Sequence, residues 1–310
     1  MKLKNKITIS IITGIIFTIT LLIPIRNHTS QNKSPAAITQ NKTFQPLKHY
    51  LVKEGLSASY LDTLFSDTRI EYYPNVLINK HKLPSYSSVE TTKRTETKFH
   101  KYNLHHFINE YSEYFEKAWN MYGVDKESIC AVLYVETKFG SQSGKHSTLN
   151  ILISLAMADQ EFALEELKKH VEQKYHYMPN HKREYIKEYY TNYAKRKANR
   201  ARKELAILLK LARKGQIEAR SLTGSYAGAF GYPQFLPSSY AKYAVDGDKN
   251  GKIDLFTFPD AILSVGNFLQ NHGWSPHIYA QKRALRRYNN SSRYVADVLN
   301  VARYFDQQPN

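Results

Sequence analysis

The sequence of 310 residues contains a single cysteine, which excludes an intramolecular disulfide framework and any zinc module built from several cysteines. The apolar neighbours of Cys130 in ESICAVLYVE indicate a small buried side chain without chemistry. The motifs of phosphate-binding loops, dinucleotide-binding folds, zinc proteases and serine hydrolases are absent, and the 12 histidines show no metal-ligand spacing. None of these reaction classes is therefore indicated.

Acidic residues are scarce relative to basic ones. There are 27 Asp and Glu against 44 Lys and Arg, so the formal net charge is +17. With 42% hydrophobic and 23% charged residues, the composition is that of a folding chain. Its length predicts about two domains, or one large domain with an appendage. The basic excess leaves nucleic acid, an anionic membrane and an anionic wall polymer open as partners.

The first 26 residues predict export. Three lysines at positions 2, 4 and 6 precede the uncharged, mostly apolar stretch 7–25, which is just long enough to span a bilayer. An uncleaved membrane anchor is the favoured interpretation, and a long cleaved signal peptide is the alternative. Both place the rest of the chain in the periplasm or on the outer face of the cell membrane, which weakens the nucleic-acid option. Residues 27–43 are polar and predict a linker.

The remaining sequence predicts a mainly α fold, because helical periodicity recurs and no alternation of strands is convincing. Two short helices are expected first, with Gly55 closing one and Ser57 capping the other. Residues 103–122 predict one amphipathic helix, and Asp125 is the expected cap of the next, over residues 126–138.

Residues 168–214 hold most of the basic excess, with 15 Lys and Arg against 4 Asp and Glu, a net charge of +11. Pro179 interrupts this basic helical insertion, and residues 184–211 predict one long helix that ends at Gly215. One interpretation is a solvated helical face. The other is contact with an anionic wall polymer or lipid headgroups.

Glu136 lies in the otherwise apolar stretch AVLYVETKFG, near the end of its predicted helix. Val132, Leu133 and Val135 would withdraw its carboxyl from water, which would raise the pKa and keep the group protonated as a general acid. The alternative is a carboxylate that points to solvent from an amphipathic helix. Periodicity alone leaves both interpretations open.

Two further segments have patterns that suggest binding. In residues 225–240, small residues let the backbone approach a ligand and Gln234 offers a donor and an acceptor, although an ordinary turn is the alternative. Residues 246–260 resemble an EF-hand loop, because acidic or amide side chains take its positions 1, 3, 5 and 9. Position 12 is Thr257, where such loops carry glutamate, so either a calcium site closed by Asp260 or a turn fits the pattern.

Three ordered segments resemble the lytic murein transglycosylase B family of bacterial peptidoglycan-cleaving enzymes. YGVDKESICAVLYVETKFG is similar to its catalytic-helix motif. A longer block runs from LTGSYAGAFGYPQFLP to FLQNHGW, and the last block is RRYNNSSRYVADVLNVA. The resemblance covers about residues 44–305 and implies a lysozyme-like, mainly α catalytic domain over that range.

The resemblance implies roles for the matched residues. Glu136 is expected to be the single catalytic acid and base. The residues expected to line the glycan cleft are Ser225, Gln234, Tyr288, Asn289 and Tyr294. The expected calcium ligands are Asp246, Asp248, Asn250, Lys252 through its carbonyl, and Asp260.

The implied reaction is cleavage of the β-1,4 bond between N-acetylmuramic acid and N-acetylglucosamine to give 1,6-anhydromuramoyl products. No cofactor is required for this chemistry, and calcium is expected only as a structural ion. Peptidoglycan strands are the expected partner, whereas nucleic acid is not expected. A hydrolytic muramidase and a non-catalytic peptidoglycan-binding or assembly protein stay open as alternatives.

Three departures from the family pattern concern the substrate subsites. The β-rich insertion usual between the HGW and RYN motifs is missing, since only a short segment separates Trp274 from Tyr288. The arginine pair often found after the catalytic helix is not visible near residues 157–163, and Phe268 stands where the family commonly has tyrosine. The subsites are therefore less well defined than the catalytic centre.

Overall fold

Twelve α-helices and two short strands make up the regular structure of the residues that the computed structural model describes, which are 44–74, 76–77 and 104–307. The mainly α fold predicted from the sequence is confirmed. The strands β1 (His146–Ser147) and β2 (Thr223–Gly224) pair antiparallel, with His146 opposite Gly224. The apolar stretch 7–25 and the linker 27–43 lie outside the described residues, and among those described no helix has the length and apolarity to cross a bilayer.

Local signals in the sequence determine the ends of the first two helices, α1 (Gln45–Lys53) and α2 (Ala58–Phe65). Gly55 follows α1 with a left-handed φ of 91°, which glycine adopts without strain. The Ser57 hydroxyl oxygen accepts a hydrogen bond from the Tyr60 amide at 3.3 Å, which satisfies a free amide at the start of α2. Both predicted boundaries are confirmed.

The single helix predicted over residues 103–122 is wrong, because the structure divides it into α3 (Leu104–Glu110) and α4 (Ser112–Tyr122). Tyr111 joins them with φ −108° and ψ 21°, outside the helical region. The bend accompanies aromatic packing, since the rings of Phe107 and Tyr111 both contact Phe258, with centroids 4.8 and 5.0 Å away. Packing between distant segments thus overrides the local helical periodicity.

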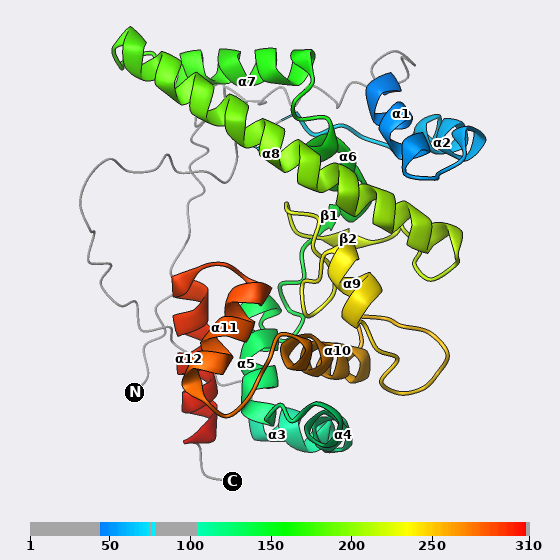
Figure 1. Cartoon of the computed structure of the whole chain (residues 1–310), viewed down its shortest axis with the longest axis vertical. Helices are drawn as coiled ribbons and strands as arrows, with labels where there is room; N and C mark the ends of the chain where they lie inside the picture. The colour runs from blue at the N-terminus through cyan, green and yellow to red at the C-terminus, as the bar shows by residue number, and fades with distance from the viewer. Residues whose placement is uncertain (1–43, 75, 78–103, 308–310) are drawn as a thin grey trace, which may run out of the picture. The chain divides into compact units, whose positions relative to one another are not determined.

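The next helix, α5 (Lys126–Thr137), begins where the sequence predicts, since the Asp125 carboxylate accepts the Ser128 amide at 2.8 Å. It ends one residue early, at Thr137, because Lys138 adopts a left-handed φ of 52°. Cys130 is fully buried within it, and burial raises the pKa of the thiol, as expected for an inert side chain. Figure 1 shows α5 beside α12 (Ser292–Asp306), against which it packs.

The predicted basic helix is confirmed as α8, although it is longer than the expected 184–211, since it runs over Asn180–Arg213 and begins directly after Pro179. It lies alongside α7 (Glu161–Lys174) in Figure 1. Glu172 on α7 pairs with Arg183 and Lys187 on α8. An apolar stripe of α8 packs against α6 (Thr148–Ala156), so one face of the helix is core and not solvated surface.

Two apolar clusters form the core. The first combines side chains of α1, α2, α6, α7 and α8. The second combines α3, α4 and α5 with α9 (Pro237–Tyr243), α10 (Phe258–Asn271), α11 (Ile278–Tyr288) and α12. The segment that joins β2 to α9 carries side chains of both clusters, and the candidate site lies along it.

Candidate active site

A cavity of about 590 Å³ lies between the two clusters, and Glu136 of α5 is part of its wall. Leu152 and Leu155 of α6 contribute from the first cluster, while Phe235 and Phe268 contribute from the second. The wall of the cavity thus combines apolar side chains with polar and charged ones.

The structure brings together most of the residues predicted to contact the glycan. Ser225, Gln234, Tyr288 and Asn289 line the same cavity as Glu136. Tyr294 is not part of the lining, but it is buried and its hydroxyl influences the Glu136 carboxyl. The binding roles of these side chains stay predictions.

The end of α5 is clamped to the 225–240 segment, which holds Glu136 in place. Thr137 is fully buried, and its hydroxyl donates to the Tyr232 carbonyl at 3.0 Å and accepts the Gly140 amide at 3.0 Å. Gly140 has φ 82°, and a Cβ atom there would lie 2.4 Å from Cε1 of Tyr232. Only glycine therefore lets the chain after Glu136 pass under the tyrosine ring.

Burial gives the Glu136 carboxyl unusual acid–base behaviour. It is largely enclosed by protein, which raises its pKa from the ordinary 4.5 to about 7, while Tyr294 acts in the opposite direction. Burial is the larger of the two effects, and the Tyr294 hydroxyl makes no well-formed hydrogen bond with any described residue. At neutral pH the protonated and ionised forms are similarly populated, so the group can serve as an acid and as a base.

Two side chains that line the cavity together with Glu136 are fixed by hydrogen bonds to backbone carbonyls. The Tyr288 hydroxyl donates to the Pro233 carbonyl at 2.6 Å. Gln234 has a left-handed φ of 51°, which is unusual for a residue with a side chain, and its Nε2 donates to the carbonyls of Ser143 and Gly231 at 3.0 and 2.9 Å. Backbone strain of this kind concentrates at functional sites.

Phe268, which stands where the family commonly has tyrosine, is buried in the cavity wall. Its ring lies 5.6 Å from that of Phe235 and 4.6 Å from that of Tyr288. The residue therefore supports the tyrosine by packing, and it supplies no polar group to the cavity.

A second carboxylate in the cavity, Glu204 of α8, was not anticipated from the sequence. It accepts hydrogen bonds from the amide and the hydroxyl of Ser238, both at 2.8 Å, in the first turn of α9. Such a carboxylate stabilises the positive end of a helix, which is a structural role. Other cavity residues that the sequence did not reveal are Val76, Leu77, Lys197, Arg200 and Arg287.

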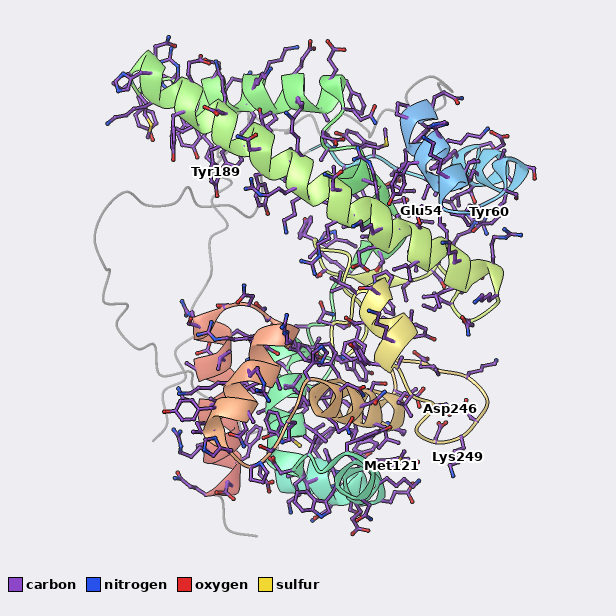
Figure 2. The ribbon with its side chains drawn as sticks, viewed as in Figure 1. Glu54, Tyr60, Met121, Tyr189, Asp246 and Lys249 are labelled. Carbon is purple, nitrogen blue, oxygen red and sulfur yellow. The ribbon has the colours of Figure 1, made fainter. Side chains whose placement is uncertain are left out.

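The predicted calcium loop joins α9 to α10, and Figure 2 labels Asp246 on it. Carboxylate oxygens of Asp246, Asp248 and Asp260 lie within 4.8 Å of one another. Asp260 is fully buried and accepts the amides of Gly247 and Asp254 at 2.7 and 2.6 Å. Burial raises its pKa, and so do the two neighbouring aspartates.

This cluster fits a hard divalent cation. Within the described residues, no lysine or arginine pairs with any of the three aspartates. Oxygen-only donors at such spacing suit Ca²⁺, which would relieve the repulsion around the buried Asp260. Asn250 and Lys252 lie in the same loop, where the Lys252 amide donates to Oδ1 of Asn250 at 2.9 Å. Their role as ligands stays a prediction.

A family model described as a transglycosylase SLT domain matches residues 39–282, which is most of the chain. The chain belongs to this family. Among curated relatives of this SLT-domain protein is the membrane-bound lytic murein transglycosylase B of Escherichia coli K12, 35% identical over 168 residues. That match covers 54% of this chain and only 37% of the relative, so it spans little more than a third of the relative's length.

Solved structures of SLT-type enzymes share the fold. The E. coli lytic transglycosylase SLT35 in complex with bulgecin A has a TM-score of 0.62 at 24% identity, with 85% of this chain and 92% of that chain covered. SltB1 of Pseudomonas aeruginosa has a TM-score of 0.62 at 22% identity, covering 83% and 97%. SltB3 of P. aeruginosa in complex with NAG-NAM-pentapeptide has a TM-score of 0.57 at 19% identity, covering 85% and 78%. The predicted lysozyme-like transglycosylase fold is thereby supported over most of the chain.

Proposed function

We propose that this chain is a lytic transglycosylase that cleaves the β-1,4 bond between N-acetylmuramic acid and N-acetylglucosamine and releases 1,6-anhydromuramoyl products. The observation that carries the proposal is the position of Glu136 on the wall of the 590 Å³ cavity, where burial raises its pKa to about 7. Membership of the transglycosylase family supports peptidoglycan as the substrate class, as does the murein transglycosylase name of the E. coli relative.

In the proposed reaction, one carboxyl group works first as acid and then as base. Protonated Glu136 donates its proton to the glycosidic oxygen as the bond from that oxygen to C1 breaks. The substrate's N-acetyl carbonyl stabilises the positive charge that develops at C1. The C6 hydroxyl of the muramoyl unit then attacks C1 and returns its proton to the Glu136 carboxylate. No water is consumed, and the enzyme recovers its starting proton.

The second carboxylate of the cavity does not fit the two-carboxylate mechanism of hydrolytic glycosidases. Glu204 is bound by the Ser238 amide and hydroxyl, whereas the pKa shift of Glu136 is caused by burial and, in the opposite direction, by Tyr294. Because both oxygens of Glu204 accept hydrogen bonds from the start of α9, no described carboxylate of the cavity lining besides Glu136 is available to activate water. This arrangement favours transglycosylation over hydrolysis.

Two further parts of the proposal concern metal and location. Asp246, Asp248 and Asp260 would hold a structural calcium ion that braces the loop between α9 and α10; a calcium complex of SLT35 is known at 22% identity. The chain is placed on the outer side of the cytoplasmic membrane, with the apolar stretch 7–25 as the segment that directs its export. The membrane-bound E. coli relative supports this location.

Mass spectrometry of the products released from purified sacculi tests the proposal. The wild type should release anhydro-muropeptides, and Glu136→Gln should lower the rate by about 100-fold or more, the usual contribution of general acid–base catalysis. Glu127→Gln is the matched control, because Glu127 lies on the same helix with a pKa also raised by burial but lines a different cavity. A Glu136→Gln variant that retains activity would refute the assignment.

A further inference from the structure

One helix directs positive charge into the cavity. Tyr193, Lys197, Arg200 and Glu204 of α8 line it, at the spacing of three and four residues that keeps side chains on one helical face. Arg287, near the end of α11, lines the same cavity. Three cations therefore surround a cavity whose proposed reaction takes place at an uncharged glycosidic bond.

Within the part of the chain that the structure describes, these cations have no anionic partner. Among the described residues, no carboxylate forms an ion pair with Lys197, Arg200 or Arg287. The Lys197 ammonium lies 5.4 Å from the centroid of the Tyr193 ring, and burial together with Arg200 lowers its pKa. Lys197 is half-buried, whereas Arg200 and Arg287 are exposed at the cavity. Basic side chains gathered at one cavity without a counter-charge among the described residues form an anion-binding environment.

The nearest acidic side chain on the same helical face does not neutralise them. Glu204 lies four residues after Arg200, but both of its carboxylate oxygens accept hydrogen bonds from Ser238. Other basic residues of α8 do have partners, since Arg183 pairs with Glu172 and Arg202 with Asp159. The cations at the cavity thus differ from these neighbours on the helix.

The pKa of the reacting group is set by other neighbours. The pKa of Glu136 responds to burial and to Tyr294, and to none of the three basic side chains. Lys197, Arg200 and Arg287 are therefore available to bind a group of the substrate that lies outside the bond being cleaved.

We propose that Lys197, Arg200 and Arg287 bind carboxylates of the peptide attached to the lactyl group of muramic acid, so that the enzyme prefers glycan that carries acidic peptides. This inference rests on the proposed function. The sugars of the glycan backbone carry no ionised group once the lactyl carboxyl is joined to peptide, whereas the peptide carries free carboxylates. Guanidinium groups bind carboxylates through paired hydrogen bonds, which favours arginine for this task.

Three matched substrates test the proposal: glycan oligosaccharides with free-acid peptides, the same compounds with amidated peptide carboxylates, and oligosaccharides without peptides. The wild type should have the highest kcat/KM for the free-acid compound, and high salt should reduce its advantage. Arg200→Gln should remove about tenfold of that preference, through KM more than kcat, because the interaction binds substrate without entering the reaction.

Lys195→Gln is the matched control, because Lys195 is an exposed cation of α8 that does not line the cavity. It should leave the preference intact, and neither variant should move the pH profile that Glu136 sets. Equal kcat/KM for the free-acid and amidated compounds, or an Arg200→Gln variant with unchanged preference, would overturn the proposal. So would a preference for phosphodiester-bearing over peptide-bearing glycan.

Failure of the proposed function gives a different result. In that case the wild type turns over none of the three compounds. Binding of these compounds, measured by calorimetry, then tests the carboxylate site without any need for turnover. Tighter binding of the free-acid compound to the wild type than to Arg200→Gln would still support the carboxylate site, while equal binding would reject it.

Discussion

Replacement of Glu136 by glutamine should stabilise the protein at alkaline pH. The folded state holds the Glu136 pKa near 7, above the 4.5 expected of an unfolded chain, so it binds the proton more tightly than the unfolded state does. The stability of the wild type therefore falls as pH rises from about 4.5 to about 7 and is constant above. At about 1.4 kcal/mol per pH unit, the loss amounts to about 3 kcal/mol.

Glutamine has nearly the same shape as the protonated side chain and never ionises. Glu136→Gln should thus equal the wild type at about pH 4 and exceed it by about 3 kcal/mol at about pH 8.5. Urea unfolding at the two pH values measures the free energies of unfolding directly. Groups that a protein needs for its activity often lower the stability of its fold.

Glu113→Gln provides a control of opposite sign. Glu113 is exposed, and hydrogen bonding from Tyr114 followed by the charge of Lys117 lowers its pKa. Its replacement should therefore cost stability at high pH and nothing at low pH. If Glu136→Gln changes stability by the same amount at both pH values, the carboxyl is not withdrawn from water and the reasoning fails.

Three further outcomes follow from the same geometry. The kcat/KM of the wild type should fall as pH rises through about 7. Tyr294→Phe should move the midpoint of this fall to higher pH, because Tyr294 lowers the pKa of Glu136. An unchanged midpoint would contradict the effect of Tyr294 on Glu136. Calcium at 100 times its dissociation constant should stabilise the wild type by about 2.7 kcal/mol, and Asp248→Ala should lose most of this stabilisation. A wild type whose stability responds neither to calcium nor to a chelator would exclude the calcium site. Gly228→Ala should destabilise more than Gly215→Ala in thermal unfolding, since both have positive φ but only at Gly228 would a Cβ atom meet a neighbour, 2.5 Å from Leu152; equal losses would show that the contact relaxes.

Local signals were sufficient where the interaction itself is local. Asp125 and Ser57 cap helices as predicted, because a side-chain oxygen and an amide three residues later need no distant partner. Pro179 precedes α8 as a local signal of another kind, because its ring fixes its own φ and it makes no side-chain cap hydrogen bond. The break at Tyr111 was not predictable in this way, because it accompanies packing against Phe258, which lies far away in the sequence.

The candidate site shows the same division. Glu136 could be identified as a candidate because its apolar neighbours along the helix indicate burial. The structure places its side chain largely within the protein. That Lys197, Arg200 and Glu204 line the cavity could not be predicted. In the sequence they are part of a long charged helix that resembles a solvated face. Their spacing is visible in the sequence, but only packing of α8 against α6 decides which face meets the cavity.

The central claim is that the Glu136 carboxylate takes up the proton of the substrate's own C6 hydroxyl and that water takes no part. Digestion of a defined glycan oligosaccharide in ¹⁸O-labelled water, followed by mass spectrometry of the muramoyl product, tests it most directly. We predict a product with no ¹⁸O and with the mass of the 1,6-anhydro sugar. A product that carries one ¹⁸O atom at a reducing end would contradict the account and identify a hydrolase.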